Sequence, residues 1–370
     1  MAVNTALTRR LGLMHPIIQA PLAGGGDTPH LVAAVCNAGA LGFIGAAYLT
    51  PAQIVDVSRA VRASTSRPFG INLFAPLPAS DAPNDPSAAV ESVAPFFAEL
   101  GLPAPSLPTS GGHSFDEQLT AALESGASVF SFTFGILPRA AIDAIKARGM
   151  FLIGTATTVE EAIALEKAGA DAVVTQASEA GGHRSTFAAS FEAGLIGAMA
   201  LVPQVVDAVN VPVIASGGIM DGRGIAATLA LGASGVQMGT AFLTCHEAGI
   251  PEAYKAAILA AREDGTRFTR AFSGRPARGI VNRFMTEVDR APESILPFPF
   301  QNALTRPLRT AAAKAGRAEF LSLWAGQGVR LARRQPAASL VARLAKDTEE
   351  AISRLAGATD RRAATIATEE

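Results

Sequence analysis

The stretch MFLIGTATTVEEAIALEKAGADAVVTQ, residues 150–176, predicts the fold of this protein. It begins with the apolar run MFLIGTAT and ends with a second one, DAVVTQ, and both have the length and composition of buried β-strands. The segment TVEEAIALEKAG between them has the apolar spacing of a helix, with a glycine at its C-terminal end. Two buried strands connected through a helix form a βαβ unit, in which the strands are parallel.

The same alternation continues on both sides of this unit, from about residue 15 to residue 245. The further strands that we expect are HPIIQAPLA (15–23), LGFIGA (41–46), PFGINLF (68–74), SVFSFTFG (128–135), VPVIASGG (211–218) and ASGVQMGTAFL (233–243). Most are continuous apolar runs, as is typical of parallel strands covered by helices on both faces. About eight such units in roughly 240 residues favour an α/β TIM (β/α)8 barrel.

An open doubly wound sheet is the alternative fold. It rarely needs so many strand–helix units, and it would favour a GxGxxG pattern after the first strand. The glycine-rich segment found there, AGGGDTP (23–29), does not match that pattern. The barrel is therefore the preferred interpretation.

Beyond residue 245 the predicted elements are helices with no clear strands between them. The helical segments include EAYKAAILAAR (252–262), QNALTRPLRTAAAKAG (301–316) and ASLVARLAKDTEEAISRLAG (338–357). We therefore expect three parts: a barrel over residues 1–245, a smaller and mainly helical C-terminal region over 246–357 that caps the active site, and a frayed polar tail over 358–370.

Composition excludes several classes of function. With a net charge of −1 and only 17% charged residues, the chain has no basic field for nucleic acid or an anionic membrane. The longest apolar runs stop at about a dozen residues, short of the roughly 20 that a membrane span requires. No apolar leader segment precedes the first strand, and neither of the two cysteines lies in a CxxC. We expect a reduced, cytoplasmic compartment and no metal site.

Catalytic residues of a TIM barrel lie at the C-terminal ends of its strands. Gln176 ends the sixth predicted strand, and the loop ASEAGGHRS (177–185) that follows places Gly181, Gly182 and His183 on this face. The glycines would let the backbone approach a flat ligand closely and stay flexible. An imidazole with an ordinary pKa of about 6.5 suits a general base near neutral pH. A loop histidine bound to a backbone carbonyl is the alternative.

Two glycine turns follow the seventh and eighth strands. Gly217 and Gly218 precede a helix that begins near Gly222, and Gly239 and Thr240 follow the last strand. Backbone N–H groups in such turns, with a helix N-terminus nearby, form a phosphate cradle. A single turn of this kind would be only a tight connection, but two at matching positions favour phosphate.

Polar side chains occur where a barrel interior would be apolar. Any one of them could be a buried group satisfied by neighbouring backbone, but four at the same barrel end favour a ring that hydrogen-bonds the edge of a heteroaromatic ligand, formed by Gln19, Asn72, Thr133 and Gln176. Arg184 either contacts an anionic ligand or is solvated. The remaining histidines show no ligand spacing and are expected to be structural or exposed: His15, His30, His113 and His246.

Several longer motifs are more specific than this general pattern. They are IIQAPLAGG (17–25), FGINLFAP (69–76), VFSFTFG (129–135), GTATTVEEAIALEKAGADAVVTQASEAGGHRSTF (154–187), VIASGGIMDGRGIAATLALGASGVQMGTAFL (213–243), FSGRPARGIVNRF (272–284) and EFLSLWAGQG (319–328). Together they resemble the class I nitronate monooxygenases, formerly called 2-nitropropane dioxygenases, from about residue 15 to residue 355.

The resemblance implies an FMN-dependent oxidoreductase that uses O2 to convert alkyl nitronates to a carbonyl compound and nitrite, without a nicotinamide cofactor. Propionate 3-nitronate, a metabolic poison, would be the substrate, so the role would be detoxification. His183 would be the catalytic histidine, and a homodimer is left open. By matched position, the FMN-binding residues would be Ala20, Pro21, Leu22, Asn72, Gln176, Gly181, Gly217, Gly218, Gln237, Met238, Gly239 and Thr240.

The chain departs from the family pattern at a few positions. Ser185 stands where the resemblance predicts glycine, and PFPFQN (297–302) contains phenylalanines where a tyrosine is expected nearby. Tyr48 and Tyr254 are the only tyrosines of the chain, so the substrate pocket is less well defined than the flavin site. Lys314 is either a positive charge facing the nitronate or a solvated helix residue.

Two other functions remain open at this point. One is an NAD(P)H-dependent quinone reductase or enoyl-thioester reductase on the same FMN barrel. The other is a non-catalytic flavin- or phosphate-binding barrel, for which a base such as His183 would be unnecessary.

Overall fold

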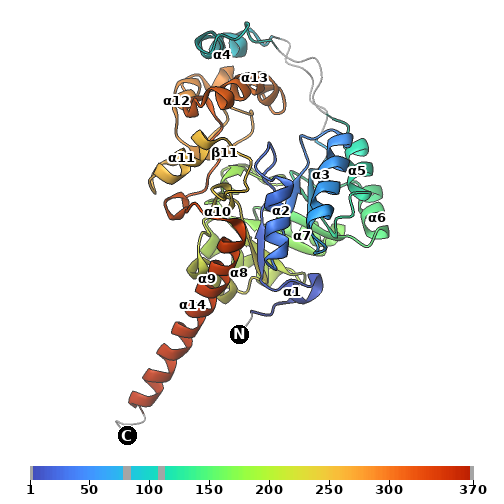
Figure 1. Cartoon of the computed structure of the whole chain (residues 1–370), viewed down its shortest axis with the longest axis vertical. Coiled ribbons are helices and arrows are strands. Elements are labelled where there is room, and N and C mark those ends of the chain that lie inside the picture. The colour runs from blue at the N-terminus through green and yellow to red at the C-terminus, as the bar shows by residue number, and fades with distance from the viewer. Residues whose placement is uncertain (1–2, 78–84, 107–112, 367–370) are drawn as a thin grey trace.

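A closed parallel sheet forms the centre of the computed structural model, which describes residues 3–77, 85–106 and 113–366 (Figure 1). Its eight strands are β1 (Ile17–Gln19), β2 (Phe43–Gly45), β3 (Gly70–Phe74), β4 (Val129–Thr133), β5 (Phe151–Ala156), β6 (Ala172–Gln176), β8 (Val213–Ser216) and β9 (Gly235–Met238). They pair in parallel in the order β1-β9-β8-β6-β5-β4-β3-β2. A parallel bridge from Ile18 of β1 to Leu41, two residues before β2, closes the ring. The predicted TIM barrel is confirmed.

Each strand is followed, directly or after an insertion, by a helix that covers the outside of the barrel. These helices are α2 (Pro29–Asn37), α3 (Pro51–Ser64), α5 (Phe115–Leu123), α6 (Arg139–Ala147), α7 (Val159–Ala168), α8 (Ala198–Ala208), α9 (Gly222–Ala230) and α14 (Ala337–Ile366). Their sequences contain standard start signals. Thr28 and Thr50 cap α2 and α3 by accepting hydrogen bonds from backbone N–H groups, each with proline at the next position.

A short helix that we did not expect, α1 (Ala6–Leu11), packs against the N-terminal end of the barrel. Its Leu7 and Leu11 join barrel residues such as Phe43, Val129 and Ile214 in one buried cluster. The barrel is therefore packed at the end opposite the carboxyl ends of the strands.

The capping region has a separate aromatic core, in which Phe284 stacks on Phe272 and contacts Phe96. Phe96 comes from α4 (Ser87–Glu99), so the insertion after β3 contributes to this region (Figure 1). Its other elements are α10 (Thr240–Leu243), α11 (Glu252–Ala260), β10 (Thr266–Thr269), β11 (Ala277–Ile280), α12 (Arg283–Val288), η1 (Pro292–Ser294), α13 (Phe300–Ala315), η2 (Ala318–Phe320) and η3 (Val329–Leu331).

Two strands in this region correct the expectation of helices alone. β10 and β11 pair antiparallel, and β11 also pairs with β7 (Gly182–His183), which lies in the loop after β6. The capping region is thus joined to the barrel loop that contains His183.

Helix α14 belongs with the barrel by its packing, although the sequence placed it in the cap. Leu340, Val341 and Leu344 lie in one buried cluster with Leu31 and Ile225 of the barrel helices. The segment between β9 and α14 is therefore a long insertion that precedes the eighth barrel helix. α14 continues through Ile366 and projects from the body (Figure 1), so the expected tail from residue 358 is helical to that point, and residues 367–370 lie outside the described residues.

Within the described ranges, none of the helices combines the length and the apolar character needed to cross a lipid bilayer.

Candidate active site

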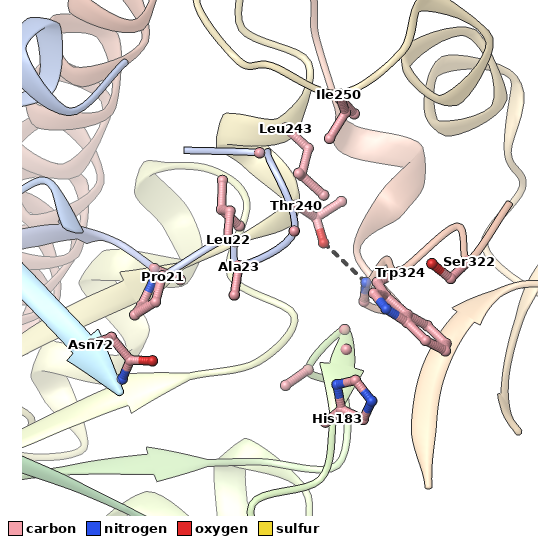
Figure 2. A pocket seen from close by; sticks show the side chains of 18 of the residues that line it. Pro21, Leu22, Ala23, Asn72, His183, Thr240, Leu243, Ile250, Ser322 and Trp324 are labelled. Atoms are coloured by element: carbon pink, nitrogen blue, oxygen red, sulfur yellow. Dashed lines mark hydrogen bonds between the residues drawn. The ribbon is translucent and has the colours of Figure 1, made fainter. Parts of the chain in front are cut away.

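A cavity of about 650 Å³ lies at the carboxyl ends of the barrel strands, under the capping region (Figure 2). Its volume is within the range of pockets that bind drug-sized ligands and cofactors. The proposed catalytic histidine and all of the proposed FMN-binding residues line this cavity: His183, Ala20, Pro21, Leu22, Asn72, Gln176, Gly181, Gly217, Gly218, Gln237, Met238, Gly239 and Thr240. The structure thus brings together residues from β1, β3, β6, β8 and β9 and the loops after them.

The loop of His183 is held in place, not flexible as expected. His183 pairs with Ala277 in the small sheet. The side-chain amide of Gln176 forms two hydrogen bonds with the loop: Nε2 donates to the His183 carbonyl (2.9 Å), and Oε1 accepts from the Ser185 N–H (2.9 Å). Ser185 also accepts a hydrogen bond from the Thr133 hydroxyl (2.6 Å), so the serine found in place of glycine helps to fix the loop.

The contacts of the His183 ring define which nitrogen can act as a base. Nε2 lies 2.8 Å from the Ser273 hydroxyl oxygen, and that hydroxyl donates its hydrogen to the Arg275 carbonyl (3.1 Å). With the serine hydrogen assigned to that carbonyl, the tautomer that fits is the one in which Nε2 donates to Ser273. Nδ1 is then the nitrogen with a free lone pair, and it is the atom that can accept a proton.

Aromatic rings surround this imidazole. The ring of Trp324 lies 5.4 Å from it, Phe134 6.0 Å and Phe298 6.1 Å, measured between centroids. Burial lowers the pKa of His183 to about 3, and the charges of Arg275 and Arg309 act in the same direction. The sequence predicted an ordinary pKa instead. The ring is therefore neutral at physiological pH.

The two glycine turns present unused backbone donors to the cavity. Among the described residues, none accepts a hydrogen bond from the N–H groups of Gly217, Gly218, Gly239 or Thr240. Gly217 and Gly218 have φ angles of 121° and 69°, which favour glycine. The next helix, α9, offers fewer free donors than expected, because its N-cap Asp221 accepts from Arg223 N and Gly224 N. The free donors are those of the turns.

The segment from Ser322 to Gly328 closes the cavity, and it is not among the site residues predicted from the sequence. Gly326 donates to the Thr240 hydroxyl oxygen (2.9 Å; Figure 2), and a Cβ on Gly181 would lie 2.5 Å from the Ala325 carbonyl carbon. Trp324 lines the cavity beside His183, and its carbonyl accepts from the Tyr254 hydroxyl (2.7 Å). The motif EFLSLWAGQG was the signal that could have identified this segment.

Two residues do not lie where the sequence suggested. Gln19 is buried in the barrel wall outside the cavity lining, and its Oε1 accepts from Phe43 N (3.0 Å). Arg184 is 1% exposed and donates to the carbonyls of Ala177, Gln176 and Gly194, so it is neither solvated nor at the ligand site.

The cavity lining is cationic on its capping side. Lys314 lines it as the sequence suggested, together with Arg306 and Arg309, which we did not predict. No aspartate or glutamate of the described chain lines it. Both tyrosines of the chain, Tyr48 and Tyr254, also line it.

Comparison with known proteins identifies the family. A sequence model described as nitronate monooxygenase matches residues 5–347. The chain belongs to the nitronate monooxygenase family. It is 42% identical to a probable nitronate monooxygenase of Staphylococcus saprophyticus, over 96% of this chain and 100% of the relative. A probable nitronate monooxygenase of Staphylococcus aureus is 44% identical, over 91% and 95% of the two chains.

Solved structures agree with this family. Nitroalkane oxidase from Streptomyces ansochromogenes superimposes with a TM-score of 0.87 at 44% identity, over 95% of this chain and 100% of that one. FabK from Thermotoga maritima is a more distant neighbour, with a TM-score of 0.76 at 30% identity over 96% and 99% of the two chains. The resemblance inferred from the motifs is confirmed, and the chain is a flavin-type oxidoreductase of the nitronate monooxygenase family.

Proposed function

We propose that this protein oxidises alkyl nitronates with O2, using FMN, to give a carbonyl compound and nitrite. Family membership supports nitronate oxidation in general. The observation that carries the finer proposal is the position of His183 in a cavity lined by cations and free backbone donors but by no carboxylate of the described chain. Such a cavity favours an anionic cofactor and an anionic substrate. Steady nitrite release from propionate 3-nitronate, the substrate that we propose, tests this function.

The lining residues fit FMN. The free N–H groups of Gly217, Gly218, Gly239 and Thr240 would bind its phosphate. The backbone of residues 20–22 would line the flavin ring, with polar or close contacts from Asn72, Gln176, Gly181, Gln237 and Met238. When bound, FMN would accept electrons from the substrate.

The residues of the chain have few proton transfers to perform in this reaction. A nitronate has already lost its α-proton, so it needs a defined position and a site without water. The rings of Phe134 and Trp324, which line the cavity beside His183, provide an apolar wall for this purpose. A neutral nitroalkane would first transfer its α-proton to Nδ1 of His183.

The lowered pKa of His183 predicts a pH profile. Because the neutral imidazole is the base, a pKa well below 6.5 extends the active range toward acid. We expect kcat/KM for neutral nitroethane, measured by oxygen consumption, to show no loss from this group between about pH 8 and pH 5. A decline centred near pH 6.5 in the wild-type enzyme, absent from His183→Asn, would contradict this role.

Gly218→Asp tests the phosphate cradle. A carboxylate next to the phosphate should be repelled by about 1–4 kcal/mol per pair of charges, which weakens FMN binding about 10–1000-fold. The measurement is the flavin content of the purified protein and FMN affinity on readdition. Gly218→Asn is the matched control, since it introduces the same Cβ close to Glu179 but no charge, and asparagine tolerates positive φ. Equal flavin content in the two variants would argue against phosphate at this turn.

A reductase on the same barrel, the alternative that the sequence leaves open, is the second candidate. Anaerobic mixing with NADH separates the two, since only a reductase should bleach the flavin rapidly. A non-catalytic flavin-binding barrel is disfavoured by the half-buried, oriented imidazole of His183, and nitrite release in the assay above would exclude it.

A further inference from the structure

Helix α13 presents three cations to the cavity: Arg306, Arg309 and Lys314. Their neighbours Thr310 and Ala313 also line it, so one face of the helix, repeating every three or four residues, is turned toward the ligand space. Arg306 and Lys314 are exposed at the mouth, and Arg309 is half-buried.

No carboxylate of the described chain neutralises these three charges. Other arginines of the capping region have such partners, for example Arg283 with Glu99 at 2.7 Å and Arg267 with Asp289 at 3.1 Å. Arg309 instead donates to the carbonyl and the side-chain oxygen of Asn302, at 2.9 and 2.7 Å. Its Nε is buried and has no hydrogen-bond acceptor.

The surroundings of Arg309 make this arrangement costly without an anion. Burial lowers the pKa of Arg309 to about 10; Tyr48 acts in the opposite direction, and the adjacent positive charge of Arg306 lowers the pKa further. Arg306 lies over the ring of Tyr48, 5.9 Å from its centroid, and forms no ion pair in the described chain. Two neighbouring guanidinium groups without a carboxylate favour binding of an oxyanion between them.

This cationic face and the proposed phosphate cradle come from different parts of the chain. The glycine turns follow β8 and β9 of the barrel, whereas the arginines belong to the capping region. Arg309 and His183 line the same cavity. An anionic group bound by α13 would therefore be part of the molecule that His183 contacts.

We propose that Arg306 and Arg309 form an anion subsite that binds a carboxylate at the far end of the substrate chain, and that they determine selectivity for carboxylated over plain alkyl nitronates. The subsite rests on the proposed function for placing the nitronate carbon beside His183. Lys314 is exposed, and its positive charge would attract carboxylated nitronates, which carry two negative charges. This attraction would weaken as the salt concentration rises.

The first test compares two nitronates with the same three-carbon chain, propionate 3-nitronate and propyl 1-nitronate. We expect the ratio of their kcat/KM values to fall about 10–100-fold in Arg306→Gln and in Arg309→Gln, as for loss of a charge-assisted hydrogen bond. Arg306→Lys keeps the charge and should recover part of the ratio. Arg10→Gln, which removes an exposed charge from α1 at the opposite end of the barrel, should leave the ratio unchanged. An unchanged ratio in both glutamine variants would overturn the subsite.

The second test does not depend on turnover. Trp324 is the only tryptophan and lines the cavity, so its fluorescence in the flavin-loaded protein reports binding of succinate, a non-reacting dicarboxylate. We expect succinate to bind wild type and Arg10→Gln alike, and about tenfold or more weakly to the two glutamine variants. Arginine-dependent succinate binding without nitronate oxidation would refute the proposed function and support the subsite. An affinity for succinate that is the same in wild type, Arg306→Gln and Arg309→Gln would refute the subsite.

Discussion

Replacing His183 by asparagine should lower kcat/KM for neutral nitroethane about 10²–10⁴-fold, the usual cost of losing a general base. Preformed ethyl nitronate has no α-proton to remove, so its oxidation should fall much less. The ring that is lost is the one whose Nδ1 is left free by the Nε2–Ser273 hydrogen bond. Both constants are measured by oxygen consumption in wild type and variant.

The outcomes of this experiment separate three roles for the histidine. FMN content should stay at the wild-type level, and His30→Asn, an exposed change on α2, should affect neither substrate. Equal losses for the two substrates would mean that His183 positions the substrate or tunes the flavin. If neither constant changed, the residue would be structural only.

Glu161→Ala should destabilise the folded protein by about 3–5 kcal/mol, as expected when a buried charged group is removed from its partners. The Glu161 carboxylate is fully buried and accepts hydrogen bonds from Thr157, Phe187 and Ala188. Its negative charge also favours the charged forms of Arg184 and Arg275, which burial disfavours. The variant would leave backbone donors unpaired and cations uncompensated. Equilibrium unfolding in urea measures the change in free energy.

Glu160→Ala is the matched control, because Glu160 is the preceding residue of α7 and is exposed. Its effect should stay within about 0.5 kcal/mol. Glu161 accepts hydrogen bonds from Phe187 and Ala188, which follow the His183 loop. Glu161→Ala should therefore also reduce the activity of the protein that remains folded. A stability loss as small as that of Glu160→Ala would show that these contacts contribute little.

Local sequence patterns were sufficient to predict the barrel but not the elements that depend on distant contacts. The strands are apolar runs that favour burial on both faces, so their pattern is visible without tertiary information. β10 and β11, TRFT and ARGI, have no such pattern, and they exist because they pair with each other and with β7. α14 was assigned to the cap because a long insertion separates it from β9, and only the packing of Leu340 and Leu344 shows that it completes the barrel.

The candidate site was predictable where a positional rule applied. Residues after strands β6, β8 and β9 had to lie at one end of the barrel, and they line the cavity there. Arg306, Arg309 and Trp324 were missed because their approach depends on how the capping region folds over the barrel. The pKa of His183 was misjudged for the same reason, since its burial comes from rings in separate segments. Gln19 was expected at the ligand because it is a polar residue in a strand, but its side chain accepts a hydrogen bond from the Phe43 N–H within the barrel wall.

The central claim is that a flavin in this cavity takes electrons directly from a nitronate. The most direct measurement is the visible absorption spectrum of the purified protein before and after anaerobic mixing with propionate 3-nitronate, with NADH in a parallel sample. The account predicts a flavin spectrum that is bleached rapidly by the nitronate and changes little with NADH. A flavin that is bleached by NADH and left oxidised by the nitronate would contradict it.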